Sequence, residues 1–206
     1  MIAIIDYSAG NTGSVINAIE SLGFKPILTS NVIQILDADA VILPGVGAAG
    51  DTVEKLTELG MHNVIRSLIV DKRPLLAICI GLQVLFSHTE EGGGRKCLDI
   101  IPGKVKKLSP GLKIPHIGWN QVEQKMSNRI FEGIPNKANF YFVHSYFADP
   151  IDKSIIAGTT EYGLEFCSII IKDNLIATQF HPEKSGEIGL RLYANFIDTA
   201  LDKGKL

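Results

Sequence analysis

Cys79, His181 and Glu183 are the side chains in this sequence whose types and positions best suit chemistry. Cys79 ends an apolar run, Pro74–Ile78, and Gly81 stands two residues further on, where a helix-like pattern begins. A strand that turns sharply into a helix exposes the turn residue at the carboxyl edge of a sheet, as in the nucleophile elbow of serine hydrolases. The helix N-terminus there favours a thiolate over a thiol. The alternative is a cysteine that only packs in the core, where free cysteines are common.

A thiol nucleophile needs a base, and the base needs a group that orients it. His181 ends a second β-like run, Ala177–Phe180, and Glu183 follows two residues later. Pro182 cannot continue a central strand, so His181 and Glu183 are expected in a loop at the end of that strand. If the two strands are parallel neighbours, their carboxyl ends lie side by side. Cys79, His181 and Glu183 would then be nucleophile, base and orienting acid.

A glycine-rich turn follows a third apolar run, Ala40–Leu43, and contains Gly45, Val46 and Gly47. Glycines let backbone amides approach a ligand closely and adopt positive φ. In a thiol hydrolase, one amide of this turn and the amide of Ile80 would form an oxyanion hole. A plain strand–helix turn is the alternative. A phosphate-binding loop is a weaker one, because no acidic residue follows a second strand in the expected place.

Composition limits the class of protein. The chain has 206 residues, enough for one α/β domain, and we expect a single domain over residues 1–206. A formal net charge of −2 gives no sign of a nucleic-acid or anionic membrane partner. Apolar runs stay well short of the roughly 20 residues that span a bilayer, and the N-terminus lacks the basic start of a signal peptide. Three widely spaced cysteines argue against a disulfide framework or a zinc site and fit a reducing compartment. We therefore expect a cytoplasmic protein without metal or cofactor.

Short apolar runs alternate with helical patterns in the first half of the chain, which predicts βαβ units and a parallel sheet. The second half is mostly strand-like until a final amphipathic helix. The expected fold is α/β, with a mixed, mainly parallel central sheet flanked by helices and an antiparallel edge. The predicted strands are Ile2–Asp6, Pro26–Thr29, Ala40–Leu43, Leu75–Cys79, Lys104–Leu108, Phe140–Phe147, Ile155–Gly158, Phe166–Ile171 and Leu175–Phe180, and the predicted helices are Thr12–Leu22, Val53–Leu59, Asn63–Val70, Leu82–Phe86 and Ile188–Leu201.

Three motifs, in this order and at these spacings, resemble the class I (triad) glutamine amidotransferases, whose fold is flavodoxin-like. They are Pro44–Gly47, Cys79–Gln83 and His181–Glu183, and the resemblance runs over nearly the whole chain. It implies that Cys79 attacks the side-chain amide of glutamine to form a γ-glutamyl thioester and release ammonia. His181 would then be the general base and acid, and Glu183 would orient it. The resemblance also implies that Gly45, Val46, Gly47, Ile80 and Gln83 contact the glutamine.

Further segments resemble one branch of that family, the glutaminase subunits of imidazole glycerol phosphate synthase in histidine biosynthesis. They are Asp6–Asn11, Ile101–Val105, Pro115–Asn120, Tyr141–Tyr146 and His181–Ser185. This resemblance implies a heterodimer in which ammonia passes to a (β/α)8 cyclase subunit. It also implies that Ser145 and Tyr146 line the glutamine pocket and that Asn11, Trp119 and Lys184 face the partner.

Other interpretations of these residues remain open. Trp119 is alternatively a core aromatic, Lys184 a solvated loop charge, and His116 and His144 structural histidines. At the level of function, the alternatives are an amidotransferase subunit for aminobenzoate, guanylate or pyridoxal phosphate synthesis, a catalytically idle binding subunit, and a free-standing thiol hydrolase of another amide. Two departures from the family pattern, a small residue at Ala49 and the stretch Cys97–Ile100, have no evident consequence.

Overall fold

The computed structural model describes residues 1–8 and 11–202; Gly10, part of the opening motif, lies outside this range. One mixed sheet organises the described chain, and ten of its strands follow the order β2-β1-β3-β4-β13-β12-β10-β7-β5-β6. β11 pairs with β12 and β8, and β8 pairs with β9. The strand bounds are β1 Ile2–Ile5, β2 Pro26–Thr29, β3 Ala40–Leu43, β4 Leu75–Ile78, β5 Phe86–Thr89, β6 Arg95–Lys96, β7 Ile101–Lys107, β8 His116–Gln124, β9 Ala138–His144, β10 Tyr146–Pro150, β11 Ile156–Glu161, β12 Glu165–Lys172 and β13 Leu175–Thr178.

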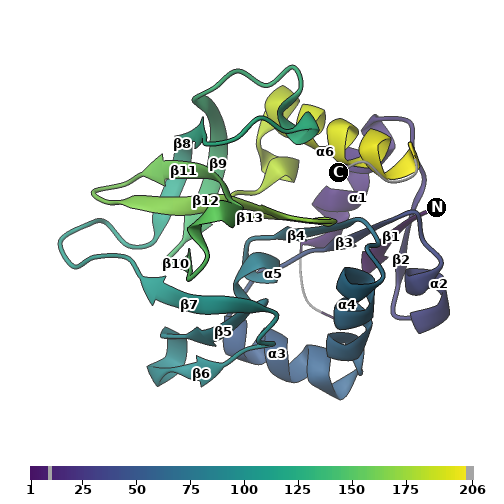
Figure 1. The fold of residues 1–206 in the computed structure, drawn as a ribbon, viewed down its shortest axis with the longest axis horizontal. Coiled ribbons are helices and arrows are strands. Elements are labelled where there is room, and N and C mark those ends of the chain that lie inside the picture. The colour runs from purple at the N-terminus through teal and green to yellow at the C-terminus, as the bar shows by residue number, and fades with distance from the viewer. Residues whose placement is uncertain (9–10, 203–206) are drawn as a thin grey trace.

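The five strands β2, β1, β3, β4 and β13 are parallel and form the centre of the fold. β1, β3, β4 and β13 are buried along their whole length, as expected for apolar strands that helices cover on both faces. Figure 1 shows α1 and α6 above this part of the sheet and α3 and α4 below it. The helices are α1 Thr12–Ser21, α2 Val32–Leu36, α3 Ala49–Glu58, α4 Met61–Val70, α5 Ile80–Gln83 and α6 Gly186–Leu201, and the 3-10 turns are η1 Glu91–Gly93, η2 Arg129–Phe131, η3 Lys153–Ile155 and η4 Pro182–Lys184. No helix in the described part of the chain is both long and apolar enough to cross a membrane.

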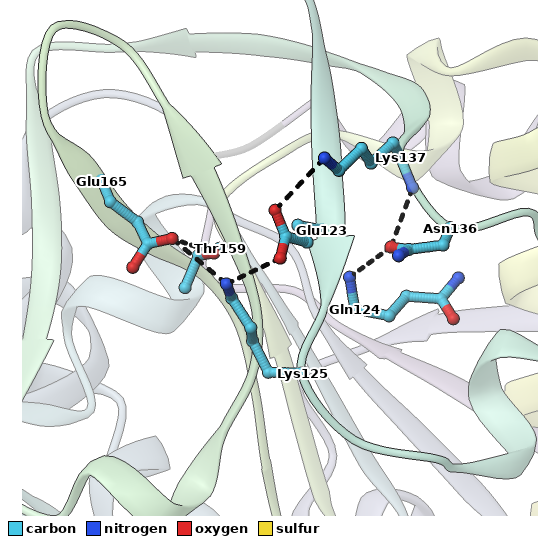
Figure 2. Close-up of polar contacts among 7 residues, drawn as sticks. All are labelled: Glu123, Gln124, Lys125, Asn136, Lys137, Thr159 and Glu165. Carbon is cyan, nitrogen blue, oxygen red and sulfur yellow. Dashed lines mark hydrogen bonds and ion pairs between the residues drawn. The ribbon is translucent and has the colours of Figure 1, made fainter.

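The second half of the chain extends the sheet with mainly antiparallel pairs and adds the β8–β9 ribbon. Charged side chains on its surface connect β8, β11 and β12 (Figure 2). The Lys125 Nζ donates to Glu123 Oε1 at 3.0 Å and to Glu165 Oε2 at 3.2 Å, and Glu165 also accepts from the Thr159 hydroxyl. Exposed pairs of this kind each contribute about 0–1 kcal/mol, so this network fixes local register more than overall stability.

The predicted fold class is confirmed, because the mixed sheet is parallel at its centre and antiparallel towards one edge. Buried apolar side chains from Ile2 to Ala200 belong to one cluster in the described part of the chain, and the single domain over residues 1–206 stays a prediction.

Three details of the secondary-structure prediction were wrong. The helix predicted over Leu82–Phe86 runs instead over Ile80–Gln83, and Phe86 begins β5, which pairs with β7. The strand predicted over Phe140–Phe147 is interrupted at Ser145 and forms two strands, β9 and β10. β8 was not predicted: its residues alternate between inward and outward positions, but Gly118 and Asn120 hide the apolar alternation that identifies a strand.

Two glycines hold the end of β3 against the turn that follows β4. A Cβ on Gly45 would lie 2.2 Å from the backbone nitrogen of Gly81, and a Cβ on Gly81 would lie 2.6 Å from the carbonyl oxygen of Leu43. Backbone meets backbone here, so neither position has room for a side chain. This contact brings the glycine-rich turn beside Cys79.

We expect Gly45→Ala to lower the free energy of unfolding by about 3 kcal/mol, because the new methyl group would overlap backbone atoms that cannot move aside. Gly13→Ala is the matched control, since an added Cβ there meets nothing within 4 Å in α1 and should raise stability by up to about 1 kcal/mol. Chemical denaturation followed by circular dichroism measures both. Equal stability of the two variants would contradict the contact.

Candidate active site

Cys79 lies at the sharp turn between β4 and α5, with φ 52° and ψ −105°. A non-glycine residue in such a conformation costs on the order of 1–3 kcal/mol and persists only when its surroundings hold it. The Cys79 N–H donates to the Thr178 carbonyl of β13 at 2.7 Å, and the residue is 4% exposed. Parallel pairing of Ile78 with Thr178 therefore sets the cysteine beside the segment that carries His181. The expected neighbourhood of the two strand ends is confirmed.

His181 and Glu183 lie in the turn after β13, as predicted. The His181 Nδ1 and Glu183 Oε1 atoms are 2.7 Å apart, and both side chains are 2% exposed. The backbone around them is fixed from two sides. The His181 N–H donates to the Tyr141 carbonyl of β9 at 2.9 Å, and the Ser185 hydroxyl donates to the His181 carbonyl at 2.6 Å. The imidazole is thereby held with its Nε2 free for Cys79.

The charge state of His181 is set by its two neighbours. Burial alone lowers the pKa of the imidazole, but hydrogen bonding and charge interactions with Cys79 and Glu183 outweigh burial and raise this pKa to about 10. The protonated ring is the form that stabilises a thiolate beside it. The arrangement therefore favours a protonated His181 beside Cys79 at neutral pH.

Tyr193 of α6 is the buried neighbour of the Glu183 carboxylate. Burial and the charge of Glu183 hold the pKa of the Tyr193 hydroxyl well above its usual range, and the hydroxyl has no hydrogen-bond partner among the described residues. The hydroxyl therefore remains a donor. Helix α6 approaches the turn closely, because a Cβ on Gly189 would lie 1.9 Å from the Pro182 carbonyl oxygen. Helix α6 thus packs against the turn that carries Glu183.

A cavity of about 390 Å³ opens in front of Cys79 and His181. Gln83 crosses its floor: the side-chain Nε2 donates to the Tyr146 carbonyl at 2.9 Å and to Gln179 Oε1 at 3.1 Å. The Gln179 amide in turn donates to Cys79 Sγ at 3.6 Å. The Gln83 Oε1 atom is buried and has no hydrogen-bond partner among the described residues, so it offers an acceptor to a ligand. Other residues that line the cavity are Val46, Gly47, Ile80, Glu91, Pro115, Val143, His144, Ser145 and Lys184.

The glycine-rich turn borders this cavity through Val46 and Gly47, whereas Gly45 packs behind it against the elbow. Gly47 has φ +94° and open space around its Cα. The fully buried Tyr7 donates its hydroxyl hydrogen to the Pro44 carbonyl at 2.9 Å and fixes the start of the turn. The turn is thus anchored at one end and free of side-chain obstruction at Gly47.

Two polar residues near the cysteine were not predicted as site residues. Glu91 begins η1, and its carboxylate accepts from the Ala49 N–H at 2.6 Å, at the start of α3. Gln179 lies on the chain between β13 and His181 and reaches Cys79 directly. Neither belongs to a recognisable motif. Alternation along the strand indicates only that Gln179 and His181 point to the same side.

The three residues expected to face a partner differ in their surroundings. Trp119 is 57% exposed and packs edge-on against Tyr141, with 6.1 Å between ring centroids. The Lys184 Nζ lies 5.9 Å from the centroid of the Tyr141 ring and also borders the cavity, so these three side chains form one exposed patch at its mouth. Asn11 directly precedes α1, which packs against η4, and its side chain makes no capping hydrogen bond to the backbone. The alternative of Trp119 as a core aromatic is wrong.

Comparisons with known proteins agree with this geometry. A family model described as glutamine amidotransferase class-I matches residues 3–199. A protein of Dehalococcoides mccartyi (strain CBDB1), named imidazole glycerol phosphate synthase subunit HisH, is 57% identical over 205 residues, which is 100% of both chains. A Methanocaldococcus jannaschii protein of the same name is 50% identical over 96% of this chain and 99% of its own. A solved structure described as a glutamine amidotransferase has a TM-score of 0.76 at 16% identity, over 97% of this chain and 99% of its own, and supports the fold alone.

We expect Glu183→Gln to lower the pKa of His181 by about one to three pH units from its value near 10, because a neutral amide no longer stabilises the imidazolium. A titration of the ring followed by NMR measures this. Glu187→Gln is the control, since Glu187 is exposed on the first turn of α6. An unchanged His181 pKa in Glu183→Gln would show that the carboxylate does not hold the ring charged.

Proposed function

Because this chain belongs to the class I glutamine amidotransferase family, we propose that it is the glutaminase subunit of an imidazole glycerol phosphate synthase. The observation that carries this proposal is the buried cluster of Cys79, His181 and Glu183 at the ends of two parallel strands. Relatives that match the chain over its full length bear the name of that subunit. Cys79, His181 and Glu183 are all present and lie together, which argues against a catalytically idle binding subunit.

In the proposed reaction, the Cys79 thiolate attacks the side-chain carbonyl carbon of glutamine. The carbonyl oxygen becomes an oxyanion, which the Ile80 amide and an amide of the Val46–Gly47 turn stabilise. The protonated His181 gives its proton to the leaving nitrogen, so ammonia departs and a γ-glutamyl thioester remains. His181 then takes a proton from water, whose oxygen attacks the thioester and releases glutamate and the thiolate. Glu183 keeps the imidazole in one orientation through both steps.

Polar groups in the cavity suit the amino-acid part of glutamine. The open Gln83 Oε1 atom accepts a hydrogen bond from the substrate, and the Glu91 carboxylate attracts its ammonium group. Ser145 and Tyr146 form the opposite wall, where the chain passes from β9 to β10. A glutamine therefore fits with its side chain towards Cys79 and its backbone groups between Gln83 and Glu91.

The partner in this proposal is a (β/α)8 cyclase subunit that receives the ammonia, and both work in the cytoplasm. The exposed patch of Trp119, Tyr141 and Lys184 supports a docking surface at the mouth of the cavity, because interfaces are enriched in aromatic residues. Ile117, 58% exposed on the same side of β8, extends this patch. Asn11 at the start of α1 contributes to the same surface. Ammonia released beside Lys184 would then leave towards the cyclase.

We expect Cys79→Ala to reduce glutamine hydrolysis by roughly 10⁴-fold or more, since no other nucleophile stands in its place. Ammonia release is measured for the chain alone and then with the cyclase subunit and its phosphoribosyl ligand. Cys97→Ala is the matched control, because Cys97 is half-buried and does not line the cavity. Near-silence of the wild-type chain alone and strong turnover with both additions would support the proposal. Turnover that survives in Cys79→Ala would overturn it.

We expect Trp119→Ala to weaken binding to the cyclase by about tenfold or more, as truncation of a central interface tryptophan does. Calorimetry of the two subunits measures the dissociation constant. Val70→Ala, at a residue that is 78% exposed at the end of α4, should leave it unchanged. If both variants bind like the wild type, the docking surface lies elsewhere.

A further inference from the structure

Two buried histidines, His116 of β8 and His144 of β9, form a hydrogen-bonded pair at the cavity, which His144 lines and His116 does not. The His116 Nδ1 and His144 Nε2 atoms are 3.0 Å apart. The His144 Nδ1 atom lies 2.9 Å from the Tyr146 carbonyl oxygen, and the Asn120 Nδ2 atom lies 3.3 Å from His116 Nε2. Both histidines are at most 5% exposed.

The hydrogen positions in this chain follow from its two ends. A carbonyl oxygen only accepts, so His144 carries its hydrogen on Nδ1 and donates to Tyr146. Its Nε2 is then an acceptor, and His116 must donate to it from Nδ1. This leaves His116 Nε2 as the acceptor for the Asn120 amide. Every ring nitrogen of the neutral pair therefore has a partner, in one tautomer of each ring.

Both rings are held neutral and in place. Burial lowers the pKa of His116, and burial with the nearby charges of His116 and His181 lowers the pKa of His144 to about 3 despite its bond to Tyr146. The His116 ring stacks on Tyr162, with centroids 4.0 Å apart, and on Phe142 at 5.1 Å. Rotation of the His116 ring out of the hydrogen-bonded plane is thereby opposed.

The carbonyl that His144 holds is also an acceptor for the cavity floor. The Tyr146 carbonyl accepts from Gln83 at 2.9 Å, so both of its lone pairs are used. Gln83 continues to Gln179, and Gln179 to Cys79. One unbroken series of hydrogen bonds therefore runs from Asn120 to the sulfur.

We propose that His116 and His144 are positioning residues for glutamine, which act by fixing the Tyr146 carbonyl and, through it, the Gln83 amide that receives the substrate. This inference rests on the proposed glutaminase function. His116 selects the tautomer of His144, and His144 aims the carbonyl. Gln83 then turns its amide nitrogen to that carbonyl and its open oxygen towards the substrate. Packing alone does not require the ring nitrogens, because phenylalanine fills the same space without two buried polar rings to satisfy.

Two substitutions of His144 separate the two nitrogens. In His144→Asn the side-chain amide stands near the place of Nδ1 and still donates to the Tyr146 carbonyl. In His144→Gln the amide reaches towards the place of Nε2, so the bond to His116 survives and the bond to Tyr146 is lost. Steady-state glutamine hydrolysis is measured with the cyclase subunit and its ligand present. We expect the KM for glutamine to be about tenfold higher in His144→Gln than in His144→Asn, with a smaller effect on kcat.

Glu165→Gln serves as the control, because it removes a charge from the surface network on β12 and touches neither the histidine pair nor the cavity (Figure 2). It should keep the wild-type KM. Circular dichroism and partner binding are recorded for each variant. A merely structural role for His144 would lower stability in both of its variants and leave their KM values equal, which would overturn the proposal.

A second readout is independent of activity. Long-range proton–nitrogen NMR correlations report which ring nitrogen of His144 carries hydrogen. We expect the Nδ1–H form in the wild-type chain, a mixture in His116→Phe, and the Nδ1–H form again in His116→Asn, whose amide still donates to His144. An Nε2–H form in the wild type would overturn the proposal.

The two proposals fail in different ways. If wild-type complex releases ammonia and the His144 variants share its KM, the positioning role falls and the glutaminase function stands. If wild-type complex releases no ammonia, the glutaminase function falls, and with it the role of the pair in binding glutamine, whatever tautomer NMR reports.

Discussion

Parallel pairing of β4 with β13 is the constraint on which the site depends. Only this pairing brings the end of one strand, at Cys79, beside a turn that begins 102 residues later, at His181. The bond from the Cys79 N–H to the Thr178 carbonyl is the last rung of that ladder, and it holds the cysteine in its strained turn. Without the rung, the backbone at Cys79 would relax towards negative φ, and the thiol would turn away from the imidazole.

Burial of the side chains at the ends of these strands determines how their pKa values respond to neighbouring groups. A lone histidine in the same surroundings would lose its proton, because desolvation penalises the charged form. Glu183 and Cys79 reverse that outcome for His181, while His144, which lacks an acidic partner, stays neutral in a comparable environment. The same side chain is therefore positively charged at one site and neutral at the other. The difference comes from which groups the backbone brings within reach, since the rings themselves are identical.

The sequence predicts the chemistry better than it predicts the recognition surface. Cys79 and His181 each follow an apolar run, with a glycine or proline just beyond them, and Glu183 follows that proline. Such local signals can be read without knowledge of the fold. The roles of Gln179 and Glu91 depend on contacts across 100 and 42 residues, and no local pattern marks them. β8 was missed for a related reason. Its residues alternate between more buried and more exposed positions, but polar and aromatic residues replace the apolar alternation that a sheet on a core would show.

The two halves of the chain divide the work of the site. The parallel strands β3, β4 and β13 end at the glycine-rich turn, at Cys79 and beside His181, the proposed nucleophile and base, and they are buried along their whole length. β9 and β10 supply a wall of the cavity, and the ribbon of β8 and β9 carries the exposed patch around Trp119. A rigid centre can thus keep one reaction while the antiparallel part changes its partner. The parallel centre and the antiparallel part must still keep a fixed position relative to each other, because hydrogen bonds connect them. Gln83 of α5 makes such a connection, because its amide donates to the Tyr146 carbonyl of β10. A shift of either part would break this hydrogen bond, and the Gln83 side chain would lose its orientation.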